Sequence, residues 1–475
     1  MNDFNKKLDA YFDITQKGST VKTEVMAGLA TFLTMCYILI VNAGMIGGVI
    51  GEGGFNAIYI ATAISAIIGT LMMGLYAKLP FAQAPGMGLN AFFTYTICFG
   101  MGIPFGSALL IVLISGLLFL TLTVVGVREK IVEGLPKSLK IAIPAGIGAF
   151  IAFIGMQNAG IIVSNPAVFV GLVDFTEMFS PANNMAAAHT AMSAFVCLVT
   201  FFAIVILAKK KMKGAIIIGL LGGTLFYYIM MLILFRQLGS YNPYAGSIES
   251  IDIFNPFAAF GDFGSKAFFQ FSVSGLFTDA SAVITFITLV ISFAIVDMFD
   301  TIGTLVGTGR KANMLDKDGN LPNMKKALLC DSVATVAGAT LGTSTVTTYV
   351  ESAAGVSVGG KTGFTAVVVA GLFFVAMFLT PIAALIPSAA TAAALIYVGV
   401  LMLGSVKDIE WDDPAVAAPC LMTILGMPLT YSIADGIGLG VITYVAIKLF
   451  TGKIKDVKLF TYIIFGLFLL KFFVL

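Results

Sequence analysis

Long apolar runs recur along the whole chain, and they decide which class of fold is open to it. Fourteen apolar stretches lie between residues 25 and 450, and most of them are close to 20 residues long. About 20 apolar residues in a helix cross the ~30 Å hydrocarbon layer of a membrane. Only 11% of the residues are charged, whereas soluble domains carry about 25%. The sequence therefore predicts an all-α, polytopic membrane protein embedded in a lipid bilayer.

Lysine and arginine residues gather in alternate loops, which predicts the orientation of the chain. The basic sites include the tail 1–24, Lys78 and the run 209–213, whereas the loops 158–187 and 236–275 are nearly free of bases. Fourteen spans with the N-terminus in the cytoplasm of a cell satisfy nearly all of these loops. The apolar C-terminal segment 451–475 either crosses as a fifteenth span or lies against the bundle in the membrane plane.

Two of the fourteen stretches are too short to cross as helices. Segments 86–99 and 350–360 follow the non-helical sequences "LPFAQAPGMG" and "LGTSTVTTY". Each can form a half-helix, and the remaining depth must be covered by extended backbone whose polar groups find partners inside the protein. Interrupted segments in matching places of two halves indicate the binding site of a transporter.

The two halves of the chain match in this way. "LIVNAGMIG" at 39–47 aligns with "AIVDMFDTIG" at 294–303, which makes Asn42 equivalent to Asp297. Asn90 and Glu351 begin the two short helices. The predicted repeats are 25–235 and 276–450, each with seven spans. Because seven is odd, the second repeat enters from the opposite side, which makes the repeat inverted.

Three acids fall at membrane depth without a lysine or arginine near them in the sequence: Asp297, Asp300 and Glu351. Charged groups there are expensive and are usually functional. Glu351 lies at the start of its short helix, where the helix dipole favours a carboxylate. The alternative is that one of these acids, Asp300 above all, only holds the unwound backbone of a broken helix.

Several neutral polar residues accompany these acids. The Asn90 amide offers a donor and an acceptor, which suits the edge of a heterocycle, although a helix cap or an interhelical bond would also explain it. Hydroxyl contacts are expected from Thr348, Tyr349, Thr347 and Thr301. His189, the single histidine, is expected near the outer end of the sixth span without a chemical role.

Residues 355–362, "GVSVGGKT", match the phosphate-binding pattern G-x-x-x-x-G-K-[ST]. A working loop of this kind follows a buried strand and opens a helix, but here a membrane half-helix precedes it. We interpret the segment as a cytoplasmic turn. The five cysteines show no metal spacing, no catalytic motif is found, and no basic face interleaved with aromatics indicates nucleic acid.

Three longer motifs carry a family resemblance. "APGMGLNAFFTYT" at 84–96, "VDMFDTIGTLVG" at 296–307 and "TLGTSTVTTYVESAAGVSVGGKTGFTAVV" at 340–368 resemble the AzgA-like hypoxanthine/guanine/adenine permeases, a branch of the nucleobase:cation symporters. The resemblance covers essentially the whole chain. It implies fourteen spans in a 7+7 inverted repeat, a homodimer, and short antiparallel strands leading into spans 3 and 10.

The resemblance also implies a core domain, here 25–127 and 276–385, and a gate domain, here 131–235 and 388–450. The functional positions of the family match Asn90, Asp297, Asp300 and Glu351. We therefore expect import of a purine nucleobase by proton symport, with the proton as coupling ion and no cofactor.

The expected roles follow from the chemistry of these groups. A carboxylate accepts two ring N–H bonds well, so Glu351 is the expected substrate contact. Asp297 is the expected proton carrier or second ligand, and Asp300 supports it. Glu351 also belongs to the expected proton-coupling group, and Asn90 orients the base or the opposed short helix. Sodium would also use carboxylates, and the preference among guanine, hypoxanthine and adenine stays open. The alternatives are xanthine, uracil or an inorganic anion as cargo, or an intramembrane aspartyl enzyme.

Overall fold

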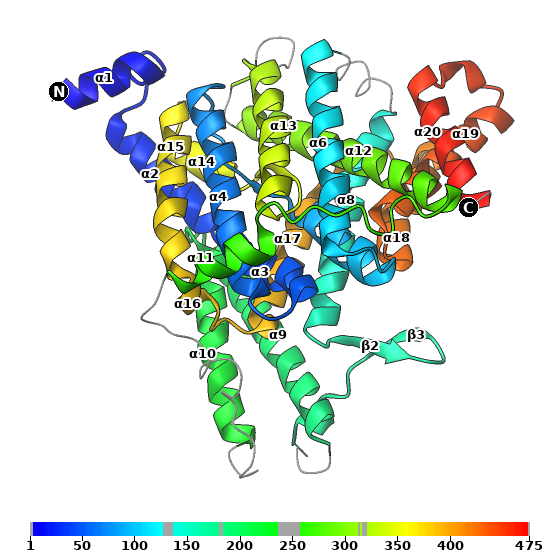
Figure 1. Ribbon diagram of the computed structural model, residues 1–475, viewed down its shortest axis with the longest axis horizontal. Coiled ribbons are helices and arrows are strands. Elements are labelled where there is room, and N and C mark those ends of the chain that lie inside the picture. The colour runs from blue at the N-terminus through cyan, green and yellow to red at the C-terminus, as the bar shows by residue number, and fades with distance from the viewer. Residues whose placement is uncertain are drawn as a thin grey trace.

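The computed structural model describes residues 3–126, 136–179, 184–235, 257–311, 314–315 and 321–473. Helices make up nearly all of the regular structure, and they pack into one bundle (Figure 1). The predicted boundary between core and gate at 127–131 and most of the loop 236–275 lie outside the described residues.

The first half of the chain begins with a polar helix, α1 (Asp3–Phe12), and a threonine cap. The Thr20 hydroxyl accepts from the Thr23 N–H, which satisfies one free donor at the start of the next helix. The elements of this half are α2 (Val21–Met35), α3 (Tyr37–Ile50), α4 (Gly54–Leu75), β1 (Gln83–Pro85), α5 (Met87–Ala91), the π-helix η1 (Phe92–Gly100), α6 (Phe105–Val125), α8 (Lys137–Asn158), β2 (Ile162–Asn165), β3 (Phe169–Leu172), the 3₁₀ turn η2 (Phe175–Phe179), α9 (Met185–Lys209) and α10 (Ala215–Phe235).

The second half repeats this order and adds a helix at its end. Its elements are α11 (Ala258–Asp262), η3 (Phe263–Ala267), α12 (Ala280–Lys311), α13 (Met324–Leu341), β4 (Val346–Thr348), α14 (Ser352–Val358), α15 (Gly363–Ala376), η4 (Met377–Leu379), α16 (Thr380–Ala383), α17 (Ser388–Leu403), η5 (Gly404–Asp408), α18 (Pro414–Thr430), α19 (Ile433–Phe450), η6 (Ile454–Asp456) and α20 (Leu459–Phe473). The last helix, α20, packs against α19 and also contacts α12.

Ten helices in the described part of the chain are long and apolar enough to cross a membrane. Two shorter apolar helices, Pro414–Thr430 and Leu459–Phe473, accompany them. The chain is therefore a multi-pass membrane protein, as predicted. The count of fourteen spans stays a prediction, because α13 and the two half-helices are not among the ten.

The two short segments form broken spans. Strands β1 and β4 pair antiparallel, with Gln83 opposite Thr348 and Pro85 opposite Val346. The half-helix of α5 and η1 follows β1, and α14 follows β4. The strand pair satisfies the backbone groups that the broken helices leave open, which confirms the short strands expected before spans 3 and 10.

The helices pack in two groups, for which we use the names core and gate. In the core, α4 contacts α3, α13 and α15, while α2 contacts α14 and α15. In the gate, α8 contacts α17, α18 and α19, and α9 contacts α10 and α17. Helices α5 and α12 of the core touch α8 of the gate, and α3 touches α17, so these five helices form the boundary between the groups.

The bundle has two distinct ends. At the basic end, Lys78 donates to the Tyr11 carbonyl near the N-terminal tail, and Lys137, Lys448 and Lys453 border one surface depression. At the hairpin end, the β2–β3 hairpin projects sideways from the bundle (Figure 1). By the distribution of positive charge, we expect the basic end in the cytoplasm.

Candidate functional site

The paired strands hold the two half-helices in register at the middle of the core. The Gln83 N–H donates to the Thr70 hydroxyl of α4 at 2.9 Å, and the Ala82 N–H donates to the Ser352 hydroxyl of α14 at 3.0 Å. The Gly86 N–H donates to the Thr345 carbonyl at 2.9 Å. Backbone at this depth is tolerated only when it is bonded inside the protein, so these contacts fix where each half-helix begins.

A cavity of about 80 Å³ lies where the half-helices meet the gate. One water needs at least about 10–15 Å³, so the cavity has room for several waters or a small flat molecule. It is lined by Tyr37, Gly86, Met87, Gly88, Asp300, Thr304, Thr347, Thr348, Tyr349, Val350, Glu351, Val398, Leu401 and Met402. The lining contains two carboxyl groups and five hydroxyl groups and no lysine, arginine or histidine. We call it the acid cavity.

Glu351 stands directly before the first residue of α14, and its side chain makes no capping bond to that helix. Its carboxylate instead accepts from the Tyr37 hydroxyl at 2.7 Å. Tyr37 is the first residue of α3, so the bond joins two core helices that are 314 residues apart in the sequence. Tyr37 bonds only Oε1 of Glu351, and Glu351 itself lines the acid cavity.

Asp300 lies on α12 and also lines the acid cavity. A Cβ atom on Gly86 would lie 3.9 Å from Oδ2 of Asp300 and 2.8 Å from Cγ2 of Thr347. Glycine at position 86 therefore lets the start of the half-helix lie close to Thr347 of β4. Strand β4 contributes Thr348, and Tyr349 follows it directly. The Tyr349 hydroxyl donates to the Pro85 carbonyl at 2.5 Å.

Asp297 and Asn90 lie behind the cavity wall. Asp297 is 1% exposed, and its Oδ2 accepts from the Thr335 hydroxyl at 3.1 Å, which in turn accepts from the Val346 N–H at 3.2 Å. The Asn90 amide donates to the Pro85 carbonyl at 3.2 Å, while its buried Oδ1 has no partner among the described residues. The structure thus places Glu351, Asp300, Thr348 and Tyr349 at the cavity, and Asp297 and Asn90 in the layer that supports it.

A further buried acid, Asp331 of α13, escaped the sequence analysis. It is 0% exposed, and its Oδ1 accepts from the Thr301 hydroxyl at 2.7 Å and from the Gln83 amide at 3.3 Å. Thr301 also bonds Thr347 at 2.7 Å, which lines the acid cavity. The criterion applied to Asp297, an acid with no lysine or arginine near it in the sequence, passes over Asp331, because Lys325 and Lys326 lie shortly before "LLCDSVAT".

The segment 355–362 ends in a turn, as interpreted. Helix α14 ends at Val358, and Gly359 has a φ of 111°, a conformation that favours glycine. The backbone N–H groups of Lys361 and Thr362 donate to the carboxylate of Glu24 at 3.0 and 3.3 Å. Since a buried carboxylate of α2 already occupies these donors, they do not form a cradle for phosphate.

The remaining polar candidates lie away from the acid cavity. The Asn42 amide donates to the hydroxyls of Thr62 and Thr343 at 2.7 and 3.0 Å. The His189 ring bonds the Tyr227 hydroxyl at 3.0 Å. All five cysteines are buried and free. Asn42 therefore joins helices of the core, and His189 joins helices of the gate.

We expect Gly88→Ala to destabilise the packing of core against gate. A Cβ on Gly88 of α5 would lie 2.3 Å from Cγ2 of Ile147 on α8, and β-branched isoleucine has little freedom to turn away. Overpacking of this kind costs about 1–3 kcal/mol, so the thermal midpoint of the purified variant should fall. Ile147→Ala in the same chain should restore it. Gly371→Ala, where nothing lies within 4 Å, is the matched control and should melt like the parent.

Comparison with known proteins points to one family. A family model described as "Permease family" matches residues 22–439. The chain is 42% identical to a putative permease of Methanocaldococcus jannaschii over 98% of both chains. It is 36% identical to the adenine permease AdeP of Escherichia coli K12, covering 98% of this chain and 95% of the relative. It is 37% identical to the guanine/hypoxanthine permease PbuG of Bacillus subtilis 168, covering 98% and 99%.

The fold is similar to that of solved transporters with little sequence identity. The transmembrane domain of a cyanobacterial bicarbonate transporter, BicA, superposes with a TM-score of 0.59 at 14% identity, covering 87% of this chain and 97% of that one. At this identity the likeness concerns the fold alone. It confirms the fold class that the sequence predicted.

Proposed function

Because this chain belongs to the permease family and is a transporter rather than an enzyme, we propose that it imports a purine nucleobase by proton symport. The curated relatives named for a cargo carry adenine or guanine and hypoxanthine, so these three bases are the candidates. The location proposed with this function is the cell membrane, with the N-terminus in the cytoplasm and a homodimer as the assembly.

The observation that supports this proposal is the composition of the acid cavity. Glu351 and Asp300 line it together with five hydroxyl groups and no basic side chain. A purine base is neutral, flat and edged with N–H donors and ring acceptors. A carboxylate is a strong acceptor for such N–H groups, and hydroxyl groups can either donate or accept.

In this proposal Glu351 accepts hydrogen bonds from the ring N–H groups of the base. The Tyr37 hydroxyl fixes one carboxylate oxygen and leaves the other for the substrate, while Thr348 and Tyr349 complete the contacts. Asp297 carries the coupling proton and Asp300 supports it. Asn90 orients the half-helix that carries Met87 and Gly88, because its amide is bonded to the Pro85 carbonyl. Movement of the core against the gate would then carry the site between the two sides.

An inorganic anion suits this cavity poorly. Anions bind where backbone or side-chain donors and positive charge converge, whereas two carboxyl groups line this cavity and no cation does. The likeness to a bicarbonate transporter is confined to the fold, so it does not reverse this argument. Xanthine differs from hypoxanthine by one ring substituent, whereas uracil has only one of the two rings of a purine. The uptake experiment below separates both from the candidate bases.

The experiment is radiolabelled uptake into a strain that lacks its own nucleobase carriers. We expect uptake of guanine, hypoxanthine or adenine that a protonophore abolishes and that replacing sodium leaves unchanged. Unlabelled xanthine and uracil should compete weakly. Uptake that follows the sodium gradient would contradict proton coupling, and saturable uracil uptake would contradict the purine assignment.

A further inference from the structure

Exposed residues of both core and gate lie on the side of Asp300 that faces the basic end of the bundle. Gly303 and Gly307 of α12 lie on that side of Asp300, both are exposed, and nothing lies within 4 Å of a Cβ placed on either. Leu401 of α17, which lines the same cavity, is 47% exposed. We therefore expect the acid cavity to be reached from this side.

A second cavity, of about 340 Å³, lies at the hairpin end of the same boundary. Core residues of α3 and η1 form one side of it and gate residues of α8 and α17 the other. It is lined by Ile40, Val41, Gly44, Met45, Phe55, Tyr95, Asn158, Ala384, Ile386, Ser388, Thr391 and Leu395. Asn158 and Ser388 are exposed, so this cavity opens at the hairpin end.

The two cavities are about one helical turn apart on both sides of the boundary. On α3, Tyr37 lines the acid cavity and Val41 lines the second one; on α17, Val398 lines the acid cavity and Leu395 the second one. Four residues of helix span about 6 Å. Tyr37, Val41 and Leu395 are each no more than 2% exposed, so a thin layer of buried side chains separates the two cavities.

Two hydrogen bonds close the boundary beside this layer, and both join core to gate. The Asn158 amide of α8 donates to the Tyr95 hydroxyl of η1 at 2.7 Å. The Thr96 hydroxyl of η1 donates to the Tyr431 carbonyl, between α18 and α19, at 2.6 Å. The Tyr431 ring also packs edge-on against the rings of Tyr95 and Phe150, with centroids 6.2 and 5.5 Å away. We call Tyr95, Thr96, Asn158 and Tyr431 the closure contact.

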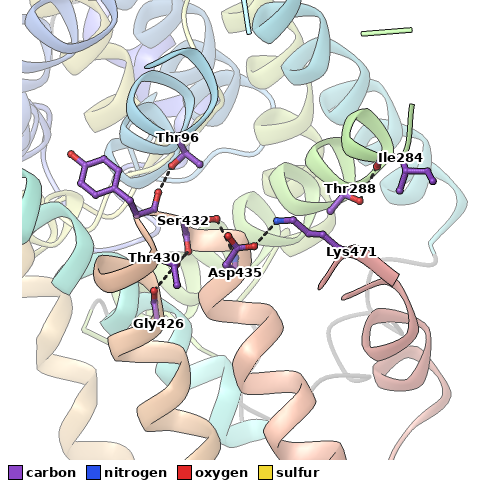
Figure 2. Close-up of polar contacts among 9 residues, drawn as sticks. Thr96, Ile284, Thr288, Gly426, Thr430, Ser432, Asp435 and Lys471 are labelled. Atoms are coloured by element: carbon purple, nitrogen blue, oxygen red, sulfur yellow. Dashed lines mark hydrogen bonds and ion pairs between the residues drawn. The ribbon is translucent and has the colours of Figure 1, made fainter. Parts of the chain in front are cut away.

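The turn that carries Tyr431 is held from its other side by the C-terminal helix (Figure 2). Tyr431 has a φ of 57° and ends α18, and the Ser432 hydroxyl accepts from the Asp435 N–H at the start of α19. The Asp435 carboxylate accepts from Lys471 of α20 at 2.5 Å, and the two side chains are 26% and 19% exposed. A partly buried ion pair thus fixes the turn between η1 and α20.

We propose that the closure contact shuts the acid cavity toward the hairpin end, and that α20 holds this contact in place through Lys471 and Asp435. The second cavity is then the access site on that side, and it admits a flat, neutral, hydrogen-bonding base once the closure contact opens. This inference rests on the proposed transport function. It gives the apolar segment 451–475 a role: α20 holds the gate half of the closure contact in place.

The test measures access to the acid cavity without using any substrate. A cysteine replaces Met402 in the acid cavity, and a membrane-impermeant maleimide is added to proteoliposomes from either side. A separate Val168→Cys reporter at the exposed hairpin shows which side is the hairpin side. In the parent, Met402→Cys should react from the basic side only.

The decisive variant is Thr96→Val, which removes the hydroxyl and keeps the shape. Loss of one hydrogen bond should raise the population of the state with an open closure contact by about fivefold. Labelling of Met402→Cys from the hairpin side should therefore rise by about that factor. Thr94→Val is the matched control, because the buried Thr94 hydroxyl in the same helix has no partner among the described residues. Equal rates in the two variants would overturn the proposal, whatever the cargo proves to be.

The brace is tested in the same assay. Lys471→Met should raise labelling from the hairpin side, and the exchanged pair Asp435→Lys with Lys471→Asp should return it toward the parent rate. If Lys471→Met labels as slowly as the parent, α20 does not brace the closure contact. Because labelling needs no nucleobase, failure of the uptake experiment and failure of the labelling experiment are distinguishable.

Discussion

Glu351→Gln should abolish accumulation of the nucleobase and weaken its binding by at least about tenfold. Glutamine keeps the size of the side chain and loses the negative charge. Hydrogen bonds to charged groups contribute about 1.5–3 kcal/mol, and each 1.4 kcal/mol is a tenfold change in affinity. The glutamine amide would also present a donor to the Tyr37 hydroxyl, which now donates to Oε1 at 2.7 Å. Binding is measured by titration of the purified protein, and accumulation by uptake.

Tyr37→Phe separates the charge of Glu351 from the orientation of its carboxylate. It removes only the hydroxyl that orients the carboxylate and leaves the negative charge in place, so it should reduce affinity by a few-fold, less than Glu351→Gln does. An uptake rate in Glu351→Gln close to that of the parent would remove Glu351 from the substrate site. Thermal unfolding of both variants serves as the control, since a loss of fold would lower binding for another reason.

The broken spans show how much of the site the sequence could predict. Segments 86–99 and 350–360 are too short to cross a membrane as helices, and the structure has them as half-helices behind a two-stranded pair. The sequence could place Asn90 and Glu351 at equivalent positions of two repeats. It could not show that Glu351 faces a cavity while Asn90 points back to the Pro85 carbonyl, because that depends on how the two repeats interlock.

The acids illustrate a second difference. Asp297 and Asp300 are three residues apart on one helix, so they lie on the same face, yet Asp300 lines the cavity and Asp297 is buried against Thr335. Asp331 lies on another helix and joins the same network through Thr301 and Gln83. Which acid reaches the cavity is decided by the packing of α12 on α13, and sequence spacing alone does not contain that packing.

The match to a phosphate-binding loop is a case in which a sequence pattern does not correspond to a site. The letters of 355–362 fit the pattern, but the membrane context already indicated a turn. The structure adds a reason that the sequence does not show: Glu24, more than 330 residues earlier in the chain, is the acceptor for the backbone N–H groups of the turn. Contacts between distant segments of this kind are set by tertiary packing.

Asp297→Asn should uncouple transport from the proton gradient and leave exchange of the base largely intact. Asparagine can still accept the bond that Thr335 now donates at 3.1 Å, so the support of strand β4 is retained. It cannot take up or release a proton. A buried carboxylate is costly to move through a low-dielectric layer, and protonation removes that cost. We therefore expect counterflow exchange near the parent rate and an accumulation ratio close to one.

Three outcomes of this experiment have different meanings. Loss of accumulation with retained exchange supports Asp297 as the proton carrier. Normal accumulation shows that the proton is carried elsewhere, and Asp300→Asn and Asp331→Asn are then compared in the same assay, since Asp300 lines the cavity and Asp331 contacts its supporting threonines. Loss of both exchange and accumulation indicates a structural role for Asp297. Thr335→Val then tests that role, because it removes the hydroxyl that joins Asp297 to Val346 and keeps the carboxylate. If the role is structural, this variant should show the same defect.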